Sequence, residues 1–199
     1  TLFRSPRRSL AEFTVSGDEV VFRGCRFITR GSSPYGYGDL YGKGAGAAVW
    51  LQKHSALQIG GDRCRVESCD FRISTFGHAI FMQGAQDTVI RNVTVVGDLR
   101  LSDELYGETT GPAAKHDHKR MFPPWLRGRP IPRDTMLSLT EDGIRAYVYG
   151  KDRQGNRRRT GHITVENCVV KRMRGGITIC MAESGTVTNC TVIDSGYPG

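Results

Sequence analysis

The sequence predicts an all-β solenoid, a parallel β-helix of about five coils. The first observation behind this prediction is that two consecutive segments, Ser55 to Gly77 and His78 to Gly97, share one pattern of three short apolar-alternating runs separated by tight turns. Runs of three or four residues at period two are too short for helices, and glycines punctuate them where the chain must bend. Because one coil cannot bury its own apolar face, we expect successive coils to stack on one another.

The second observation is a pair of aligned columns that recur along the chain. One column follows the second run of each coil, and the other lies one residue earlier. The members are Cys25, Cys69, Val93, Cys168 and Cys190 in the first, and Gly24, Ser68, Asn92, Asn167 and Asn189 in the second. Stacked strands repeat every ~4.8 Å, so we expect the asparagine amides to hydrogen-bond to one another up the stack. The cysteines should be small thiols buried in the core.

A leucine-rich repeat is the main alternative fold, because it has a similar period and its own asparagine column. That motif needs leucine at its consensus positions, and residues 160 to 199 contain no leucine. The runs are filled instead by Val, Ile, Thr, Phe and Cys, without a helical segment. The composition therefore favours a β-helix with three strands in each coil over a leucine-rich repeat.

Taken in order, the chain alternates coils with inserts. Residues 11 to 30 match the first copy of the pattern, and the pattern resumes at residues 141 to 150 and 162 to 196. We expect inserts at 31–53, which is rich in Gly and Tyr, at 98–140, which contains prolines and charges, and at 150–161, which is basic. We expect residues 1–199 to form a single domain that is truncated at both ends, since an uncapped solenoid leaves its strand edges open.

The charge distribution indicates the class of partner. The formal net charge is +8, and the excess lies largely in the inserts, for example at Lys151, Arg157, Arg158 and Arg159. Such clusters favour a polyanion, and an acidic polysaccharide fits better than a nucleic acid because the chain has no recognised nucleic-acid-binding module. Solvated loops with no partner are the alternative. No apolar run approaches the ~18 residues of a membrane span, and no pattern indicates an oligomeric state.

Three features together resemble the right-handed parallel β-helix of the pectate lyase superfamily. They are three strands in each coil, an asparagine column between the second and third strands, and large inserts after the third strand. The resemblance covers residues 11–30, 55–97 and 141–196. It implies a polysaccharide cleft on the face of the first strands and a secreted or periplasmic location. It does not select one activity, because that architecture also serves hydrolases, epimerases and phage tailspikes.

The register of the coils predicts which side chains meet in the cleft. We place Leu57, Ile80, Ile144 and Ile177 in one inward column, which puts Gln58, Phe81, Arg145 and Thr178 outward at the next position. Gln83 and Tyr147 lie further along the same face. His78 and Asp142 lie at the corner where the strand begins and should be one strand spacing apart. The inserts that end at Lys53 and Thr140, and the basic insert, should form the walls.

An acidic-sugar lyase removes the proton α to a uronate carboxylate and expels the glycosidic oxygen, which requires a base, a cation and an acid. We assign His78 as the base, Asp142 as its orienting partner, Arg145 as the cation, and Tyr147 or His54 as the acid. The expected substrate-binding residues are Lys53, Gln58, Phe81, Gln83, Arg174 and Trp125. Alternatively, Glu141 and Asp142 hold a Ca²⁺ ion that neutralises the carboxylate.

Several other interpretations stay open at this level. A hydrolase of the same fold would use two carboxylates, for which Glu141 with Asp142 or Glu104 are the candidates. A non-catalytic glycan-binding or tailspike-like protein would use Trp125, Phe81 and the tyrosines. His78 could also be a corner residue bonded to backbone, with Arg145 and Tyr147 on an ordinary outer face. The sequence thus predicts a polysaccharide lyase, or a related epimerase, as the first hypothesis.

Overall fold

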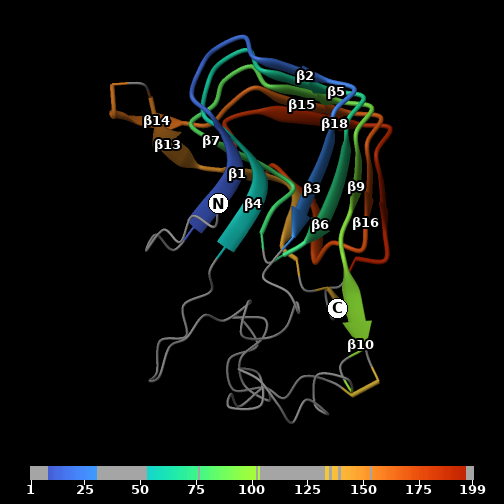
Figure 1. The fold of residues 1–199 in the computed structure, drawn as a ribbon. Helices are drawn as coiled ribbons and strands as arrows, with labels where there is room; N and C mark the ends of the chain where they lie inside the picture. Colours follow the sequence, from blue (N-terminus) through green and yellow to red (C-terminus); the bar gives the residue numbers. More distant parts are fainter. Residues whose placement is uncertain are drawn as a thin grey trace, which may run out of the picture.

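A computed structural model describes residues 9–30, 53–75, 77–101, 103, 133–134, 136–138, 140–152 and 154–195. Every named element in this part of the chain is a β-strand, so the expected all-β class is confirmed. Fifteen of the strands form three parallel sheets of five strands each (Figure 1). This arrangement is consistent with a parallel β-helix or solenoid.

The first sheet collects the first strand of each predicted coil. Its strands, in spatial order, are β1 (Ser9–Val15), β4 (Lys53–Ile59), β7 (Ile80–Gln83), β12 (Asp142–Tyr147) and β17 (Gly175–Thr178). The spatial order equals the sequence order, so each coil lies on the one before it. Leu57, Ile80, Ile144 and Ile177 are register partners, as the sequence predicted.

The other two sheets repeat the same stacking order. The second contains β2 (Val21–Arg23), β5 (Arg65–Glu67), β8 (Val89–Arg91), β15 (Ile163–Glu166) and β18 (Gly185–Thr188). The third contains β3 (Arg26–Arg30), β6 (Asp70–Ser74), β9 (Thr94–Val96), β16 (Val169–Lys171) and β19 (Thr191–Ile193). Figure 1 shows the coils running from β1 at one end of the stack to the red strands at the other.

Two antiparallel hairpins leave the stack. β10 (Leu99–Leu101) pairs with β11 (Met136–Ser138) inside the expected insert at 98–140. β13 (Tyr149–Lys151) pairs with β14 (Arg157–Arg159), so the basic insert expected at 150–161 is a hairpin whose first strand starts one residue earlier. Residues 31–52 and 104–132 lie outside the described residues, and the predictions for Trp125 and Glu104 fall there.

The core lies between the three sheets and is built mainly from inward-facing positions of the strands before the last coil, because β18 and β19 are exposed at every position. Its largest fully buried side chains are Leu57, Ile59, Phe71, Ile73, Ile80, Met82 and Ile90. Phe27 and Phe71, on neighbouring strands of the third sheet, stack with ring centroids 4.4 Å apart. Each such side chain contributes about 1.5–3 kcal/mol through removal from water, so stacking the coils stabilises all of them together.

The asparagine column has a backbone explanation. Asn92, Asn167 and Asn189 have φ of 54°, 53° and 51°, and Ser68 and Gly24 in the same column have 52° and 65°. Asn and Gly tolerate this left-handed conformation better than other residues. Asn92 and Asn167 are exposed, and their backbone N–H groups donate to carbonyls of the next coil at 3.0 Å. The expected ladder of side-chain amides is therefore wrong, because no amide-to-amide bond joins these described residues.

The cysteine column faces inward as predicted. All six cysteines are free thiols, and Cys69 and Cys168 are buried. The Sγ of each donates to the carbonyl two residues earlier at 3.2 Å, which satisfies the thiol inside the core. Burial raises the pKa of the Cys168 thiol to about 11. Separately, no helix in the described ranges has the length and apolarity needed to cross a membrane.

Candidate functional site

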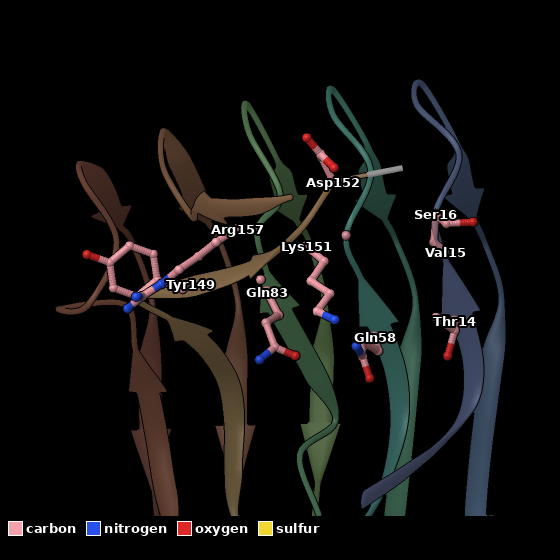
Figure 2. Close-up of a pocket in the computed structure, with 11 residues that line it drawn as sticks. Thr14, Val15, Ser16, Gln58, Gln83, Tyr149, Lys151, Asp152 and Arg157 are labelled. Atoms are coloured by element: carbon pink, nitrogen blue, oxygen red, sulfur yellow. The ribbon is translucent and has the colours of Figure 1, made fainter. Parts of the chain in front are cut away.

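A groove of about 530 Å³ lies between the β13–β14 hairpin and the ends of β1, β4 and β7. Its polar lining comes from three strands of the first sheet and from the hairpin. These residues are Thr14, Ser16, Gln58, Gln83, Lys151, Asp152 and Arg157. Figure 2 shows Lys151 reaching from the hairpin toward the space between Gln83 and Gln58. The sequence had predicted the basic segment as one wall of a groove, and the structure confirms that wall.

The floor of the groove is polar because it is the outward face of the first sheet. Thr14 on β1 is the register partner of Gln58 on β4, so their side chains point away from the core on adjacent strands. Gln83 follows at the end of β7, one strand further along. Hydroxyl and amide groups can both donate and accept hydrogen bonds, which suits a ligand with many hydroxyls. Gln58 and Gln83 were predicted as substrate-binding residues, and both line the groove.

The wall of the groove carries two cations. The Arg157 guanidinium lies over the Tyr149 ring, 3.7 Å from its centroid, and this cation–π contact holds the guanidinium in place. Lys151 is the register partner of Arg157 across the hairpin. Among the described residues no carboxylate forms an ion pair with Lys151 or Arg157. Asp152 is the one carboxylate among the lining residues, so the two cations leave an excess of positive charge for a ligand in the groove.

The hairpin base sits close to the coil below it. Gly150 lies so near the backbone of Gln83 and Gly84 that a Cβ at this position would collide with the Gln83 carbonyl. Gly84 donates its N–H to the Thr160 hydroxyl at 2.6 Å. Glycine at residue 150 is thus required for the hairpin to pack where it forms the wall.

A second group of charged residues lies buried at the opposite end of the same sheet. It contains His78, Glu141, Asp142 and Arg174, each no more than 5% exposed, together with the partly buried Arg145. Arg174 pairs with Glu141 at 3.1 Å, and Arg145 pairs with Asp142 at 3.2 Å. Gly175 leaves room for the Asp142 carboxylate, which occupies the place of a Cβ. The two arginines balance the two carboxylates in charge.

His78 and Asp142 are neighbours, as the register predicted, but the geometry does not favour His78 as a base. The Asp142 backbone N–H donates to His78 Nδ1 at 3.2 Å, so Nδ1 carries a lone pair that is already engaged. Nε2 lies 3.1 Å from Glu141 Oε2 in the same buried cluster. The ring also stacks on Phe81, with centroids 5.1 Å apart.

Several predicted site residues lie outside this groove, and their assigned roles stay predictions. His78, Asp142, Glu141 and Arg174 do not line the groove and lie together in a buried charged cluster. Phe81 is also buried, between His78 and the Tyr147 ring. Glu141 and Asp142 do not fit a Ca²⁺ ion, since an arginine already neutralises each carboxylate. The described part of the chain contains no cluster of three or more metal-ligating side chains.

The remaining predicted residues lie elsewhere. The Arg145 guanidinium lies 5.2 Å from the centroid of the Tyr147 ring on the outer face of β12. His54 pairs with Glu12 at 3.1 Å near the start of β4, at the other end of that strand from the groove. Lys53 is the first residue of β4, and its side chain is not described.

Sequence reasoning missed Lys151 and Arg157 as site residues, although it noted the basic segment. The signal lies in residues 149 to 159, where two short runs are joined by a turn that contains Gly155, as in a β-hairpin. Alternate residues of such a hairpin share one face, and Lys151 and Arg157 are two of them. Sequence reasoning also missed Thr14, at an outward position of β1, and Ser16, just after the end of that strand.

No known family matches this chain. Neither the models of protein families nor the curated proteins contain a match to it. The chemistry of the groove must therefore be inferred from its own residues. Two cations and one carboxylate on the wall, beside a floor of hydroxyls and amides, can bind a ligand that carries both anionic groups and hydroxyls.

Proposed function

We propose that this chain is a right-handed parallel β-helix, similar to the pectate lyase superfamily, that binds an acidic polysaccharide in the groove beneath the β13–β14 hairpin. The observation that carries the proposal is Lys151, which reaches over Gln58 and Gln83, together with Arg157 beside Tyr149 on the same wall (Figure 2); neither cation pairs with a carboxylate among the described residues, although Asp152 also lines the groove. Three parallel sheets with strands in sequence order support the fold part of the proposal.

The composition of the groove favours an acidic glycan over other anions. A uronate residue presents a carboxylate for Arg157 or Lys151 and hydroxyls for Gln58, Gln83 and Thr14. A compact anion such as free phosphate would use the cations but leave the polar floor unused. The groove volume of about 530 Å³ lies within the ~300–1,000 Å³ of typical ligand sites.

Binding without cleavage is the activity that the geometry supports best. β-Elimination needs a base that reaches the substrate, and His78 is only 3% exposed, with Nδ1 accepting from the Asp142 N–H and Nε2 facing the buried Glu141 carboxylate. The lyase hypothesis stays a proposal that would need another base, because Lys151 and Arg157 are cations at neutral pH. Polymers of this kind occur outside the cell, so we propose a secreted or periplasmic location.

The proposal is tested by titrating the protein with oligomers of polygalacturonate, alginate and glucuronan, with neutral dextran as the comparison ligand. We expect binding to at least one polyuronate and none to dextran. Lys151→Ala/Arg157→Ala should weaken it by about 30- to 100-fold, corresponding to ~1–1.5 kcal/mol for each charged contact. Arg26→Ala is the matched control, because Arg26 is an exposed arginine on β3 outside the groove.

Two outcomes would contradict this function. Absence of binding to every polyuronate in the panel would overturn it, as would equal losses in the groove variant and the Arg26→Ala control. Absorbance from unsaturated uronate ends, recorded in the same experiment, separates a lyase from a protein that only binds. Reducing ends without that absorbance would indicate a hydrolase.

A further inference from the structure

The β13–β14 hairpin is joined to the stack by an ion pair on its rear face. We propose that Arg158 and Asp62 are positioning residues that hold the cationic wall of the groove in its binding position. This inference rests on the proposed function for the identity of the ligand. Whether the ion pair holds the hairpin in place can be measured without any ligand.

The alternation of the hairpin separates its two faces. Lys151 and Arg157 are register partners that line the groove, and Gly150 and Arg158 are the next pair. Successive side chains of a strand point to opposite faces, so Arg158 points away from the two groove cations. It is therefore free to bond to the stack while they face the ligand.

Arg158 makes a two-pronged bond to Asp62 in the turn after β4. Nη1 lies 2.9 Å from Asp62 Oδ2, and Nη2 lies 2.7 Å from Asp62 Oδ1. Nη2 also donates to the Gly60 carbonyl at 3.0 Å. The two side chains are 28% and 22% exposed, so water screens this pair less than a surface pair. Bidentate arginine–carboxylate bonds fix orientation as well as distance.

Asp62 is itself held by the coils on either side. Its backbone N–H donates to Asp18 Oδ1 at 3.0 Å, in the coil before. Its Oδ1 accepts from the Gln86 N–H at 3.2 Å, in the coil after. The hairpin leaves the stack after β12, and Arg158 thereby bonds it to a turn that is itself bonded to the coils before and after it.

The other contacts of the hairpin lie near its base or involve its backbone rather than its cationic side chains. Gln86 Nε2 donates to the Arg159 carbonyl at 2.7 Å, and Thr160 N–H donates to the Val148 carbonyl at 2.9 Å. Arg159 approaches Glu183 at 3.5 Å. Among the hairpin side chains in the described residues, Arg158 is the one that bonds to the coils that form the groove floor, to Asp62 and to the Gly60 carbonyl. Loss of these bonds should let the wall move relative to Gln58 and Gln83.

The experiment compares Arg158→Met with Arg91→Met. Arg91 pairs with Glu166 at 2.9 Å between coils of the second sheet, so its loss removes a similar bond outside the groove. Amide hydrogen exchange is followed at Asp152, whose N–H donates to the Asn156 carbonyl, and at Val89 inside the stack. We expect exchange at Asp152 to accelerate about tenfold or more in Arg158→Met only, with Val89 unchanged. Arg158→Lys keeps the charge without the fork and should give an intermediate rate.

Binding of a polygalacturonate oligomer supplies the second readout, and we expect Arg158→Met to weaken it about tenfold while Arg91→Met changes it less than twofold. Equal Asp152 exchange in the two variants would overturn the positioning role. Faster exchange with unchanged binding would overturn it as well. A wild-type protein that binds no polyuronate overturns the proposed function instead, and the exchange rates then still decide whether this ion pair holds the hairpin.

Discussion

The two charged regions of the first sheet differ in how their charges are paired. At the start of β12, Glu141 and Asp142 are buried and each meets an arginine within 3.2 Å. At the groove, Lys151 and Arg157 meet no carboxylate in the described residues and are exposed. A buried charge must be paired to be tolerated, whereas an exposed unpaired charge is stable in water and available to a ligand. We infer that the first region stabilises the fold and that the second one binds.

The buried region should be the more sensitive to substitution. Glu141→Ala removes the carboxylate that bonds to both Arg174 and His78. We expect the free energy of unfolding to fall by about 3–5 kcal/mol, because a buried arginine loses its counter-charge. Chemical denaturation measures this, with Glu166→Ala as the control, since Glu166 is a partly exposed partner of Arg91 and should cost only ~0–1 kcal/mol. Similar losses of unfolding free energy in both variants would contradict the distinction between buried and exposed charged residues.

A smaller effect is expected at the buried thiol of Cys168. Burial raises the pKa of this thiol to about 11, above the ordinary value of 9.0. The folded state therefore retains a proton that the unfolded state loses, so this stabilising contribution is complete below pH 9.0 and disappears as pH rises toward about 11. Cys168→Val should fit, because Val93 occupies the same column. We expect the variant to lose less stability than the wild type between those pH values, and equal alkaline losses would refute this account.

The groove region should show the smallest effect on stability. Lys151→Ala/Arg157→Ala removes two exposed side chains that form no ion pair in the described residues. We expect the free energy of unfolding to change by no more than about 0.5 kcal/mol. Loss of the Arg157–Tyr149 contact is the main contribution. A loss above 2 kcal/mol would show that these cations support the fold, contrary to our interpretation.

Much of the stacking could be predicted because it follows from local periodicity. Alternation at period two identifies inward residues, and a repeat fixes which of them become neighbours, so the Ile80–Ile144 pairing and the proximity of His78 to Asp142 followed directly. The cysteine column followed in the same way, since small apolar side chains at one position suit a shared core.

The sequence could not show whether a corner position is covered. His78 lies where the register placed it, but its burial depends on Phe81, Glu141 and the chain packed around them. Asn167 shows a second limit, because an asparagine column fits either a side-chain ladder or a left-handed turn, and only the φ of 53° decides between them. The sequence shows that the segment is basic, but which of its cations face the groove depends on how the two strands of the hairpin pair.

The most direct test of the central claim compares one variant from each region by calorimetric titration with a polygalacturonate oligomer. His78→Gln changes the buried cluster, and Lys151→Ala/Arg157→Ala changes the groove. We predict that the folded His78→Gln protein binds within about threefold of the wild type, while the groove variant loses about 30-fold or more. Loss of binding in His78→Gln with binding retained in the groove variant would contradict the assignment of these two regions.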